Sequence, residues 1–222
     1  MRIAIYDLDR TVLRHASYTP FLIFAARRRA PLRLASVPVW IAAMALYKLR
    51  LFSRDALKNF GLRLFIGRDA DDAALDDLGA AFARRIIPGW VAPGAAASIA
   101  RERAEGHRLV LATAAMGFYA RPIGDLLGFD AVIATPHVAD PGRHAPRIAG
   151  GNCYGAGKLE ACRRWLEEAG VVRGEARLRF YSDSASDAPM LDFADEALFV
   201  TARPAVARRA RDRGWLPVDF RR

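Results

Sequence analysis

The stretch IAIYDLDRT, at residues 3–11, is the strongest indication of the fold class of this chain. Its apolar part, residues 3–6, is typical of a buried strand, and the carboxylates Asp7 and Asp9 follow at the strand's carboxyl end. Farther along, the sequence predicts strands at 108–113, 130–135, 177–182 and 197–201 and helices at 93–106, 117–127, 156–169 and 188–194. This alternation predicts an α/β fold with a Rossmann-like, doubly wound parallel sheet, whose functional site lies at the carboxyl ends of its strands.

The segment at residues 14–87 breaks the alternation, because it predicts one helix after another without a strand between them. We expect this segment to be an all-helical cap inserted after the first strand, with Pro88 and Gly89 marking its end. The predicted core domain therefore consists of residues 1–13 and 88–222, and the predicted cap of residues 14–87.

The composition is that of a globular protein. Of the 222 residues, 53% are hydrophobic and 26% are charged, which excludes a disordered or collagen-like chain. The two cysteines, Cys153 and Cys162, are too few for a disulfide framework or a thiolate metal site, so we expect a reducing, intracellular location. Asp7 interrupts the first apolar run too early for a signal peptide, so secretion is not expected.

The positive charge is concentrated in the cap. The formal net charge is +10, and residues 14–68 contain eleven Lys or Arg against a single acid, Asp55. Within this basic segment, residues 34–47 carry no charge and would form a helix about 21 Å long, shorter than the hydrocarbon core of a bilayer, about 30 Å. They suit either burial inside the cap or insertion into an anionic membrane surface without crossing it.

Two predicted strand ends contain polar residues suited to nucleophilic attack, proton transfer or anion binding. Asp7 and Asp9 can share a turn, so that one carboxylate attacks while the other transfers protons; alternatively, both only hydrogen-bond the turn. Thr113 ends its predicted strand, and the small residues after it, beginning with Ala114, expose backbone N–H groups that open the next helix. That arrangement binds anions, although Thr113 could equally be an ordinary helix N-cap.

Two further positions complete the set. Lys158 lies just inside a predicted helix, where it could bind an anion. The usual alternative is a solvated surface lysine, and this alternative is weakened because the chain has only three lysines among 34 basic residues. Asp183 and Asp187 follow the strand at 177–182 and could supply oxygen ligands for Mg²⁺, while Asp187 could also cap the helix containing Pro189. Each signal is ambiguous alone, but their common position at strand ends or helix starts indicates one site.

These motifs resemble those of the haloacid dehalogenase (HAD) superfamily of aspartate-nucleophile phosphatases. The four matching motifs are Asp7-Leu-Asp9-Arg-Thr11, Thr113, Lys158 and Asp183-Ser-Ala-Ser-Asp187. A helical cap between the first two motifs is similar to that of subfamily IB, whose members resemble phosphoserine phosphatase and have a C1-type cap. Residues 152–158 and 181–191 are most similar to a bacterial branch that includes phosphatidylglycerophosphatase C and the CicA-like proteins. Arg10 departs from the pattern, since the family usually has a small residue there.

The resemblance implies a role for each motif residue. Asp7 would attack phosphorus and form a phosphoaspartyl intermediate, and Asp9 would act as the general acid and base. Mg²⁺ would be held by Asp7, Asp183 and the backbone carbonyl of Asp9, with Asp187 acting through water or from behind these ligands. The phosphoryl oxygens would be bound by Thr113, the Ala114 N–H and Lys158.

The cap suggests a lipid phosphate as the substrate. Phosphoserine phosphatases have a glutamate nine residues after the nucleophile to bind the substrate amine, and this chain has Ala16 there. The basic and apolar segment instead favours phosphatidylglycerophosphate at an anionic membrane surface, with three arginines attracting its headgroup: Arg10, Arg27 and Arg33. We therefore expect a cytoplasmic protein, peripheral to the inner face of the cell membrane.

Two alternatives to a lipid phosphatase follow from the same residues. A phosphatase of small soluble phosphomonoesters would use the same aspartates with an unrelated cap surface. A basic module that binds nucleic acid would explain the charge, but nucleic acid is not expected as a partner, because such a module does not require Asp7, Asp9, Asp183 and Asp187 together.

Overall fold

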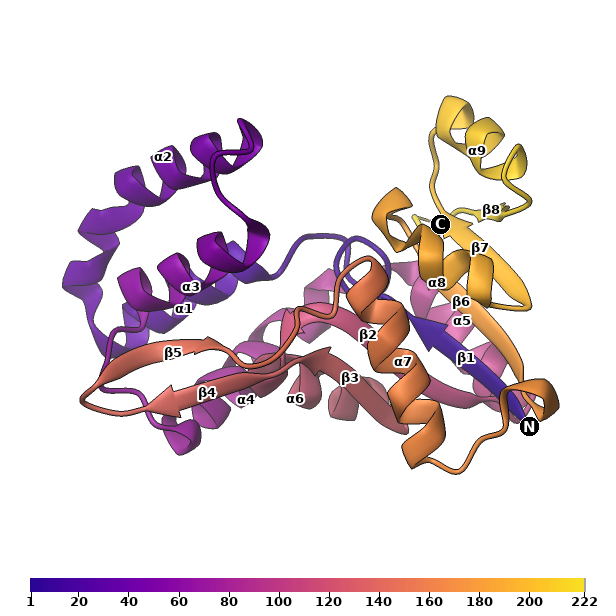
Figure 1. Ribbon diagram of the computed structural model, residues 1–222, viewed down its shortest axis with the longest axis horizontal. Helices are drawn as coiled ribbons and strands as arrows, with labels where there is room; N and C mark the ends of the chain where they lie inside the picture. The colour runs from indigo at the N-terminus through magenta and orange to yellow at the C-terminus, as the bar shows by residue number, and fades with distance from the viewer. Residues whose placement is uncertain (222) are drawn as a thin grey trace.

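Residues 1–221, which the computed structural model describes, contain a six-stranded sheet that is parallel throughout (Figure 1). The strand order is β3-β2-β1-β6-β7-β8. The strands are β1 (Arg2–Tyr6), β2 (Arg108–Met116), β3 (Ala131–Thr135), β6 (Arg177–Ser182), β7 (Glu196–Val200) and β8 (Leu216–Val218). Successive strands run outward from β1 first on one side and then on the other, which confirms the predicted doubly wound α/β sheet.

Helices cover both faces of the sheet. One face carries α5 (Pro93–Ala104) and α6 (Gly117–Leu127), and the other carries α7 (Ala156–Glu168), α8 (Ala188–Phe193) and α9 (Pro204–Arg211). Alternate side chains of a strand point to opposite faces, so Ala4 and Tyr6 pack with the first group of helices and Ile3 and Ile5 with the second. All four residues are fully buried, which explains why this strand has no polar face.

The predicted strands and helices of the core domain are present, with their ends shifted by at most three residues. Elements that were not predicted include the antiparallel pair β4 (His137–Asp140) and β5 (His144–Ile148), the helix α9 and the edge strand β8. The strands of the β4–β5 pair contain histidine, aspartate and arginine, and β8 has only three residues with Pro217 among them. None of these strands has the apolar run by which a buried strand is recognised in a sequence.

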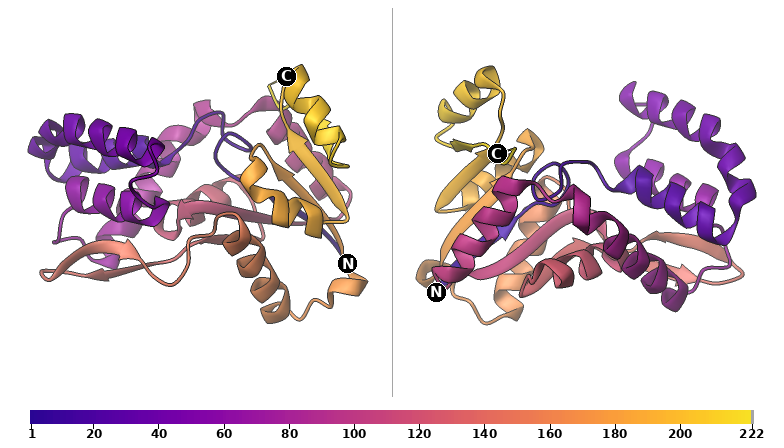
Figure 2. Two further views of the ribbon diagram at one scale, coloured as in Figure 1. Left: turned by 45° about the horizontal axis from the view of Figure 1, so that its top comes forward. Right: turned by 180° about the vertical axis from the view of Figure 1, so that it is seen from behind.

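The inserted segment is all-helical, as predicted. It consists of α1 (Tyr18–Arg29), the 3₁₀ helix η1 (Pro31–Ser36), α2 (Val37–Lys48), α3 (Arg54–Phe65) and α4 (Asp72–Trp90). Figures 1 and 2 show α1, α2 and α3 grouped at the end of the molecule opposite α9 and β8, with the β4–β5 hairpin beside α3. The side-chain oxygen of Asn59 in α3 accepts a hydrogen bond from the Ile148 N–H at 2.9 Å, so the hairpin joins the core domain to the cap.

Helix α4 continues through Pro88 and Gly89 and ends at Trp90. It packs along α6, and Gly79 permits the close approach, because a Cβ atom at this position would lie 1.8 Å from the Phe118 carbonyl oxygen. Helix α4 thus belongs to the insertion by sequence and packs against the core domain. The division of the chain into a cap and a core domain at residue 88 stays a prediction.

Helix α2 is packed on one face and exposed on the other. Trp40 and Ala43 are buried, and Trp40 Nε1 donates a hydrogen bond to Thr19 Oγ1 at 3.3 Å. Large apolar side chains are exposed elsewhere on α2 and just after it: Val39 by 51%, Ile41 by 55%, Leu49 by 69% and Leu51 by 68%. Burial inside the cap therefore explains only some of the apolar residues in the uncharged segment at residues 34–47. Within residues 1–221, no helix is both long enough and apolar enough to span a membrane.

Candidate active site

The candidate active site is a pocket of about 250 Å³ at the carboxyl ends of β1, β2 and β6. The strand order reverses beside β1, and this is where doubly wound sheets bind their ligands. The pocket brings together every residue that the sequence predicted for catalysis, metal binding or phosphate binding: Asp7, Asp9, Thr113, Ala114, Lys158, Asp183 and Asp187.

Backbone hydrogen bonds position the turn after β1. The Asp7 N–H donates to the Tyr181 carbonyl oxygen at 2.9 Å, which extends the pairing of β1 with β6 by one residue. Asp9 Oδ1 accepts a hydrogen bond from the Ser17 N–H at 2.8 Å, immediately before α1. Arg10, between the turn and the cap, has a φ of +64°, in the left-handed region that glycine adopts with least strain. The turn thereby holds both aspartates and Arg10 at the pocket.

Lys158 is the central cation of the site. It is only 1% exposed, and its Nζ donates to Asp7 Oδ1 at 2.7 Å and to Asp187 Oδ2 at 2.6 Å. This burial excludes the alternative of a surface lysine. Ser182 Oγ also donates to Asp187 Oδ2, at 2.8 Å, and the Asp187 side chain makes no capping hydrogen bond to α8. Asp187 therefore acts in the pocket although it precedes a helix.

Burial changes the proton affinity of these groups. Desolvation raises the pKa of Asp7 to about 7, against the opposing effect of Lys158, and it raises the pKa of Asp183 to about 6. Desolvation also raises the pKa of Asp9, although hydrogen bonds from Ser17 oppose it. Burial acts to lower the pKa of Lys158, but the neighbouring carboxylates raise it overall, so the ammonium stays charged. A half-buried carboxyl with a raised pKa, such as Asp9, is suited to give a proton to a leaving group.

The surroundings of Thr113 and Ala114 differ from the prediction. Strand β2 continues beyond Thr113 to Met116 with an irregular register, and α6 begins only at Gly117. The N–H groups after Thr113 therefore do not open a helix, and the Ala115 N–H is bound by Thr113 Oγ1 at 3.0 Å. The predicted start of this helix at Gly117 is confirmed, but the prediction that the strand ends at Thr113 was wrong, because an irregular stretch of β2 separates Thr113 from the helix.

Several polar residues near the pocket were not identified from the sequence as site residues. Arg54 of α3 and Tyr154 line the pocket, and the Arg54 guanidinium carbon lies 3.6 Å from the centre of the Tyr154 ring. Lys58, also from α3, is buried, and its Nζ donates to the Ala114 carbonyl oxygen at 2.5 Å. Lys58 is one of the three lysines of the chain, so the scarcity that singled out Lys158 could have indicated it too.

A polar network connects α3 to the end of β2 that contains Ala114. The side-chain oxygen of Asn152 accepts hydrogen bonds from Lys58 Nζ and from Thr135 Oγ1, both at 2.9 Å. The Asn152 amide nitrogen donates to Asp55 Oδ1 at 2.8 Å, and Thr135 Oγ1 also lies 2.9 Å from the Ala114 carbonyl oxygen. We call Asp55, Lys58 and Asn152 the cap–core bridge. It couples the position of the cap to that of Ala114.

Two arginines that were expected to attract the substrate headgroup lie outside this pocket. The Arg33 guanidinium donates to the Arg63 carbonyl oxygen at 3.2 Å and thus connects η1 to α3. Arg27 lines a separate cavity of about 890 Å³ between α1 and α4. Arg27 follows Ser17 by ten residues, so the rise of α1 carries it about 15 Å away from the aspartates. Of the three predicted cap contacts, only Arg10 lines the pocket.

The pocket carboxylates suit a magnesium ion. Asp187 Oδ1 is buried and has no hydrogen-bond partner among residues 1–221. Asp183 is half-buried beside it, and its position is set by its N–H, which donates to Thr11 Oγ1 at 3.0 Å. Carboxylate oxygens gathered in this way are the donors that Mg²⁺ prefers. This arrangement is compatible with the predicted ligands, which are Asp7, Asp183 and the Asp9 carbonyl. Asp187 would then act without binding the metal directly.

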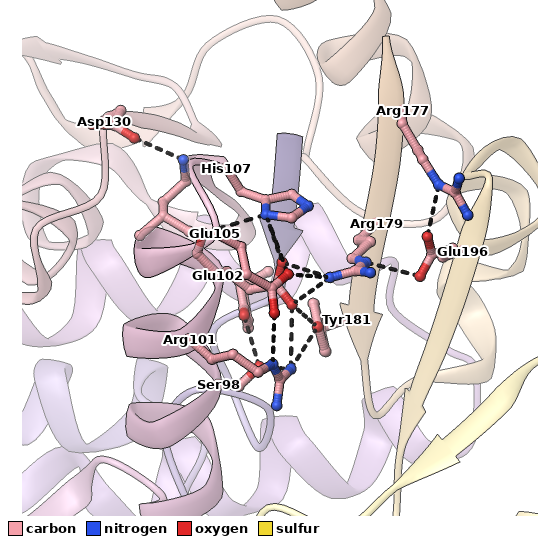
Figure 3. A network of polar contacts seen from close by, with 12 residues as sticks. Ser98, Arg101, Glu102, Glu105, His107, Asp130, Arg177, Arg179, Tyr181 and Glu196 are labelled. Atoms are coloured by element: carbon pink, nitrogen blue, oxygen red, sulfur yellow. Dashed lines mark hydrogen bonds and ion pairs between the residues drawn. The ribbon is translucent and has the colours of Figure 1, made fainter. Parts of the chain in front are cut away.

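A second acidic cluster lies at the opposite ends of the strands (Figure 3). Oxygen and nitrogen atoms of Glu102, Glu105 and His107 lie within 4.8 Å of one another. Glu102 is fully buried and accepts hydrogen bonds from Tyr181 Oη at 2.6 Å and from an Arg179 guanidinium nitrogen at 3.0 Å. Because protein donors already satisfy this carboxylate, the cluster joins α5 to β6 and is not the predicted magnesium site.

Comparison with known proteins agrees with this geometry. Residues 4–192 match the family of haloacid dehalogenase-like hydrolases. The chain is 28% identical to the protein CicA of Caulobacter vibrioides, over 86% of this chain and 82% of that protein. It is 25% identical to a histidinol-phosphatase of Neisseria meningitidis, over 63% of each. A crystal structure of a Bordetella pertussis protein of unknown function superposes with a TM-score of 0.86 at 27% identity, covering 99% of this chain and 98% of that one.

The family match extends over most of the chain, and the relatives include both a CicA protein and a named phosphatase. The resemblance inferred from the motifs is thus confirmed. The buried aspartates and lysine of the pocket are the groups that such a family needs for phosphate chemistry. The protein therefore belongs to the haloacid dehalogenase-like hydrolases and is a phosphatase.

Proposed function

We propose that the protein hydrolyses phosphomonoesters in a Mg²⁺-dependent reaction that passes through a phosphoaspartate on Asp7. The observation that supports this most is the contact of 2.7 Å between Lys158 Nζ and Asp7 Oδ1 inside a buried pocket. The ammonium orients the nucleophilic carboxylate and lies close enough to neutralise an incoming phosphoryl oxygen as well.

The residues of the pocket suit two chemical steps. An Asp7 oxygen attacks phosphorus, the bond from phosphorus to the leaving oxygen breaks, and Asp9 gives that oxygen a proton. Water then attacks the phosphorus of the phosphoaspartate, Asp9 takes a proton from the water, and release of phosphate restores Asp7. When bound at Asp7 and Asp183, Mg²⁺ screens the repulsion between the nucleophile and the phosphate. The phosphoryl oxygens are bound by Thr113, the Ala114 N–H and Lys158.

The surface of the cap supports a lipid phosphate, such as phosphatidylglycerophosphate, as the substrate. Ile41, Leu49 and Leu51 are exposed on α2 and the turn after it, and the exposed Lys48 and Arg50 lie beside them in the chain. Exposed apolar side chains together with basic residues are typical of elements that lie in an anionic membrane interface. We infer that the protein is cytoplasmic and attaches peripherally to the inner face of the cell membrane, which would concentrate it where a two-chain lipid resides.

A small soluble phosphomonoester is the second candidate substrate. The histidinol-phosphatase relative is named for such a compound, and a pocket of about 250 Å³ accommodates a small headgroup. Phosphoserine is disfavoured, because Ala16 lines the pocket at the position where phosphoserine phosphatases have a glutamate for the substrate amine.

The test is a phosphate-release assay on both substrate classes, with and without Mg²⁺. Phosphatidylglycerophosphate in mixed micelles is compared with phosphoserine and glycerol 3-phosphate, after EDTA treatment and after Mg²⁺ is restored. We expect release that depends on Mg²⁺, with the lipid preferred. Release that persists in EDTA would contradict the metal dependence, and preference for the soluble esters would favour the second candidate.

A further inference from the structure

The active-site pocket contains two arginines that the reaction described above does not use. Arg10 enters it from the turn after β1, and Arg54 enters it from the first turn of α3 in the cap. Within residues 1–221, the buried Nε of Arg54 has no hydrogen-bond partner. A buried donor without a partner is costly unless a bound ligand completes it. Arg54 is therefore placed to bind something other than the protein.

Arg10 faces acids of the pocket, since its charge acts to lower the pKa of Asp9 and of Asp183, whereas Arg54 forms no ion pair within residues 1–221. Asp55 accepts a hydrogen bond from the Asn152 amide at 2.8 Å, and Lys158 binds both Asp7 and Asp187. The neighbouring Lys58 is a second cation. Its pKa is lowered to about 8, most of all by burial and next by the charge of Arg54. Arg54 and Lys58 thus bring two cations to the cap side of the pocket, where Asp55 is the one acid of α3.

Tyr154 determines how the Arg54 guanidinium is presented. The guanidinium carbon lies 3.6 Å from the centre of the Tyr154 ring, a contact in which the ring face attracts the cation. A planar guanidinium that rests on a ring keeps the N–H groups at its edge available, and these match the paired oxygens of a carboxylate or phosphate. The contact holds this arginine ready for an anion before substrate arrives.

We propose that Arg54, with Arg10, binds a second anionic group in the leaving portion of the substrate. The enzyme would then select phosphomonoesters whose leaving group also carries carboxylate or phosphate oxygens. This inference rests on the proposed function, because it takes the transferred phosphate to lie at Asp7 and Lys158. The phosphodiester of a glycerophospholipid headgroup and the carboxylate of a soluble ester offer the same chemistry to Arg54, whereas a cationic leaving group would be repelled.

The wild-type protein is tested with esters that differ mainly in the charge of the leaving group. The soluble series is 3-phosphoglycerate (anionic), glycerol 3-phosphate (neutral) and phosphoethanolamine (cationic); the lipid pair is phosphatidylglycerophosphate (anionic) and phosphatidic acid (neutral). We expect kcat/KM to fall in the order anionic, neutral, cationic, with about tenfold between the first two. The soluble and lipid arms together show which source of the anion the enzyme prefers.

Substitution of the arginine tests its role directly. Arg54→Gln should reduce the ratio of kcat/KM for 3-phosphoglycerate over glycerol 3-phosphate by about tenfold or more, mainly through KM, and Arg54→Lys should restore part of it. Arg63→Gln, which changes an exposed arginine on the same helix, is the matched control and should leave the ratio unchanged within about twofold. Tyr154→Ala should lower the ratio as well, because it removes the ring on which Arg54 rests.

A binding measurement separates this inference from the proposed function. Asp7→Asn protein is titrated calorimetrically with 3-phosphoglycerate and glycerol 3-phosphate, and the anionic ester should bind about tenfold more tightly. If no ester is hydrolysed but this difference is found, the proposed function fails and the anion site stands. Equal binding of the two esters, or an Arg54→Gln variant that loses activity equally on every ester, would overturn the anion site while leaving the phosphatase reaction intact.

Discussion

Lys158 shows at the scale of single residues how burial produces reactivity. Its ammonium is enclosed with Asp7 and Asp187, and its pKa is raised because two carboxylates lie within hydrogen-bond distance. The same enclosure raises the pKa of Asp7 to about 7 by desolvation. One cation thus compensates two buried carboxylates incompletely, and the remaining negative charge is available for a metal ion.

Asp7→Asn should abolish turnover while the protein stays folded. Asparagine keeps the shape of the side chain but cannot attack phosphorus, so kcat should fall by about a thousandfold or more. Phosphate release is measured with saturating Mg²⁺, and circular dichroism verifies the fold. Retention of most of the activity would show that Asp7 is not the nucleophile.

The same variant should change how stability depends on pH. The folded-state pKa of Asp7 is about 7, above its ordinary value of 3.8, so folded protein binds this proton more tightly than unfolded protein. Ionised Asp7 therefore destabilises the metal-free fold above about pH 7, and the penalty disappears as the pH falls from about 7 towards 4. Metal-free Asp7→Asn should exceed the wild type in Tm at about pH 8, and this advantage should shrink as the pH falls and be lost near pH 4. Parallel Tm profiles of the two proteins would contradict the raised pKa.

Lys158→Ala should lower kcat/KM by about a hundredfold or more, because it removes a preorganised charge from the phosphoryl group. The measurement is initial-rate kinetics on one soluble ester, with a thermal melt to separate lost activity from lost fold. Lys48→Ala, at an exposed lysine, is the control and should behave as the wild type. A loss within about twofold for Lys158→Ala would remove this residue from the phosphate site.

At the scale of elements, α3 is the part of the cap that reaches the chemistry. It contributes Arg54 to the pocket and Asp55 and Lys58 to the cap–core bridge, while Asn59 binds the β5 backbone. A single helix therefore connects the inserted segment to the end of β2 and to the hairpin. This arrangement makes the position of the cap and the position of Ala114 interdependent.

Asn152→Ala should impair activity through this bridge. It leaves Lys58 Nζ, Asp55 and Thr135 without a shared partner and removes a restraint on Ala114. We expect a loss of about 1–3 kcal/mol in the free energy of unfolding and a fall in kcat/KM of about tenfold. Asn59→Ala, which loses one hydrogen bond to the hairpin, is the control: it should cost similar stability but leave kcat/KM within about threefold. Equal kinetic effects of the two variants would separate the bridge from phosphate binding.

Helix α4 offers a matched pair of glycines for a test of its packing. Gly79→Ala would place a Cβ atom 1.8 Å from the Phe118 carbonyl oxygen, whereas nothing lies within 4 Å of a Cβ atom at Gly89. We expect Gly79→Ala to lower the free energy of unfolding by about 1–3 kcal/mol or more, and Gly89→Ala to leave it equal or raise it by up to about 1 kcal/mol. Urea unfolding monitored by circular dichroism measures both. Equal stabilities would show that α4 and α6 can separate without cost.

At the scale of the whole molecule, the apolar surface of the cap and its basic residues predict binding to anionic membranes. The protein should sediment with vesicles that contain phosphatidylglycerol, and less so as the NaCl concentration rises. Leu49→Asp with Leu51→Asp should weaken binding by about tenfold, and replacement of Arg27, Arg28 and Arg29 with Gln should weaken it as well. Val172→Asp, at a residue 61% exposed in the core domain, is the control and should not affect binding. Failure of the wild type to bind anionic vesicles would favour the soluble substrate.

The sheet, the order of the motifs and the residues at the strand ends could be predicted from the amino-acid sequence. Apolar runs such as residues 3–6 are local patterns, and parallel strands bring their carboxyl ends to one edge, so Asp7, Thr113 and Asp183 could be placed together without coordinates. The register of an irregular strand end could not be predicted in this way, since the bulge after Thr113 depends on pairing with β3.

The packing of the helices and strands determines which side chains meet across the pocket and which apolar residues stay exposed. Arg54 and Tyr154 are far apart in the chain, and their contact depends on how α3 docks against the loop before α7. The uncharged residues 34–47 show the same limit, because Trp40 is buried and Ile41 is 55% exposed although both are apolar neighbours. Hydrophobicity determines the tendency of a side chain to leave water, whereas the neighbouring elements determine whether a surface is present to cover it.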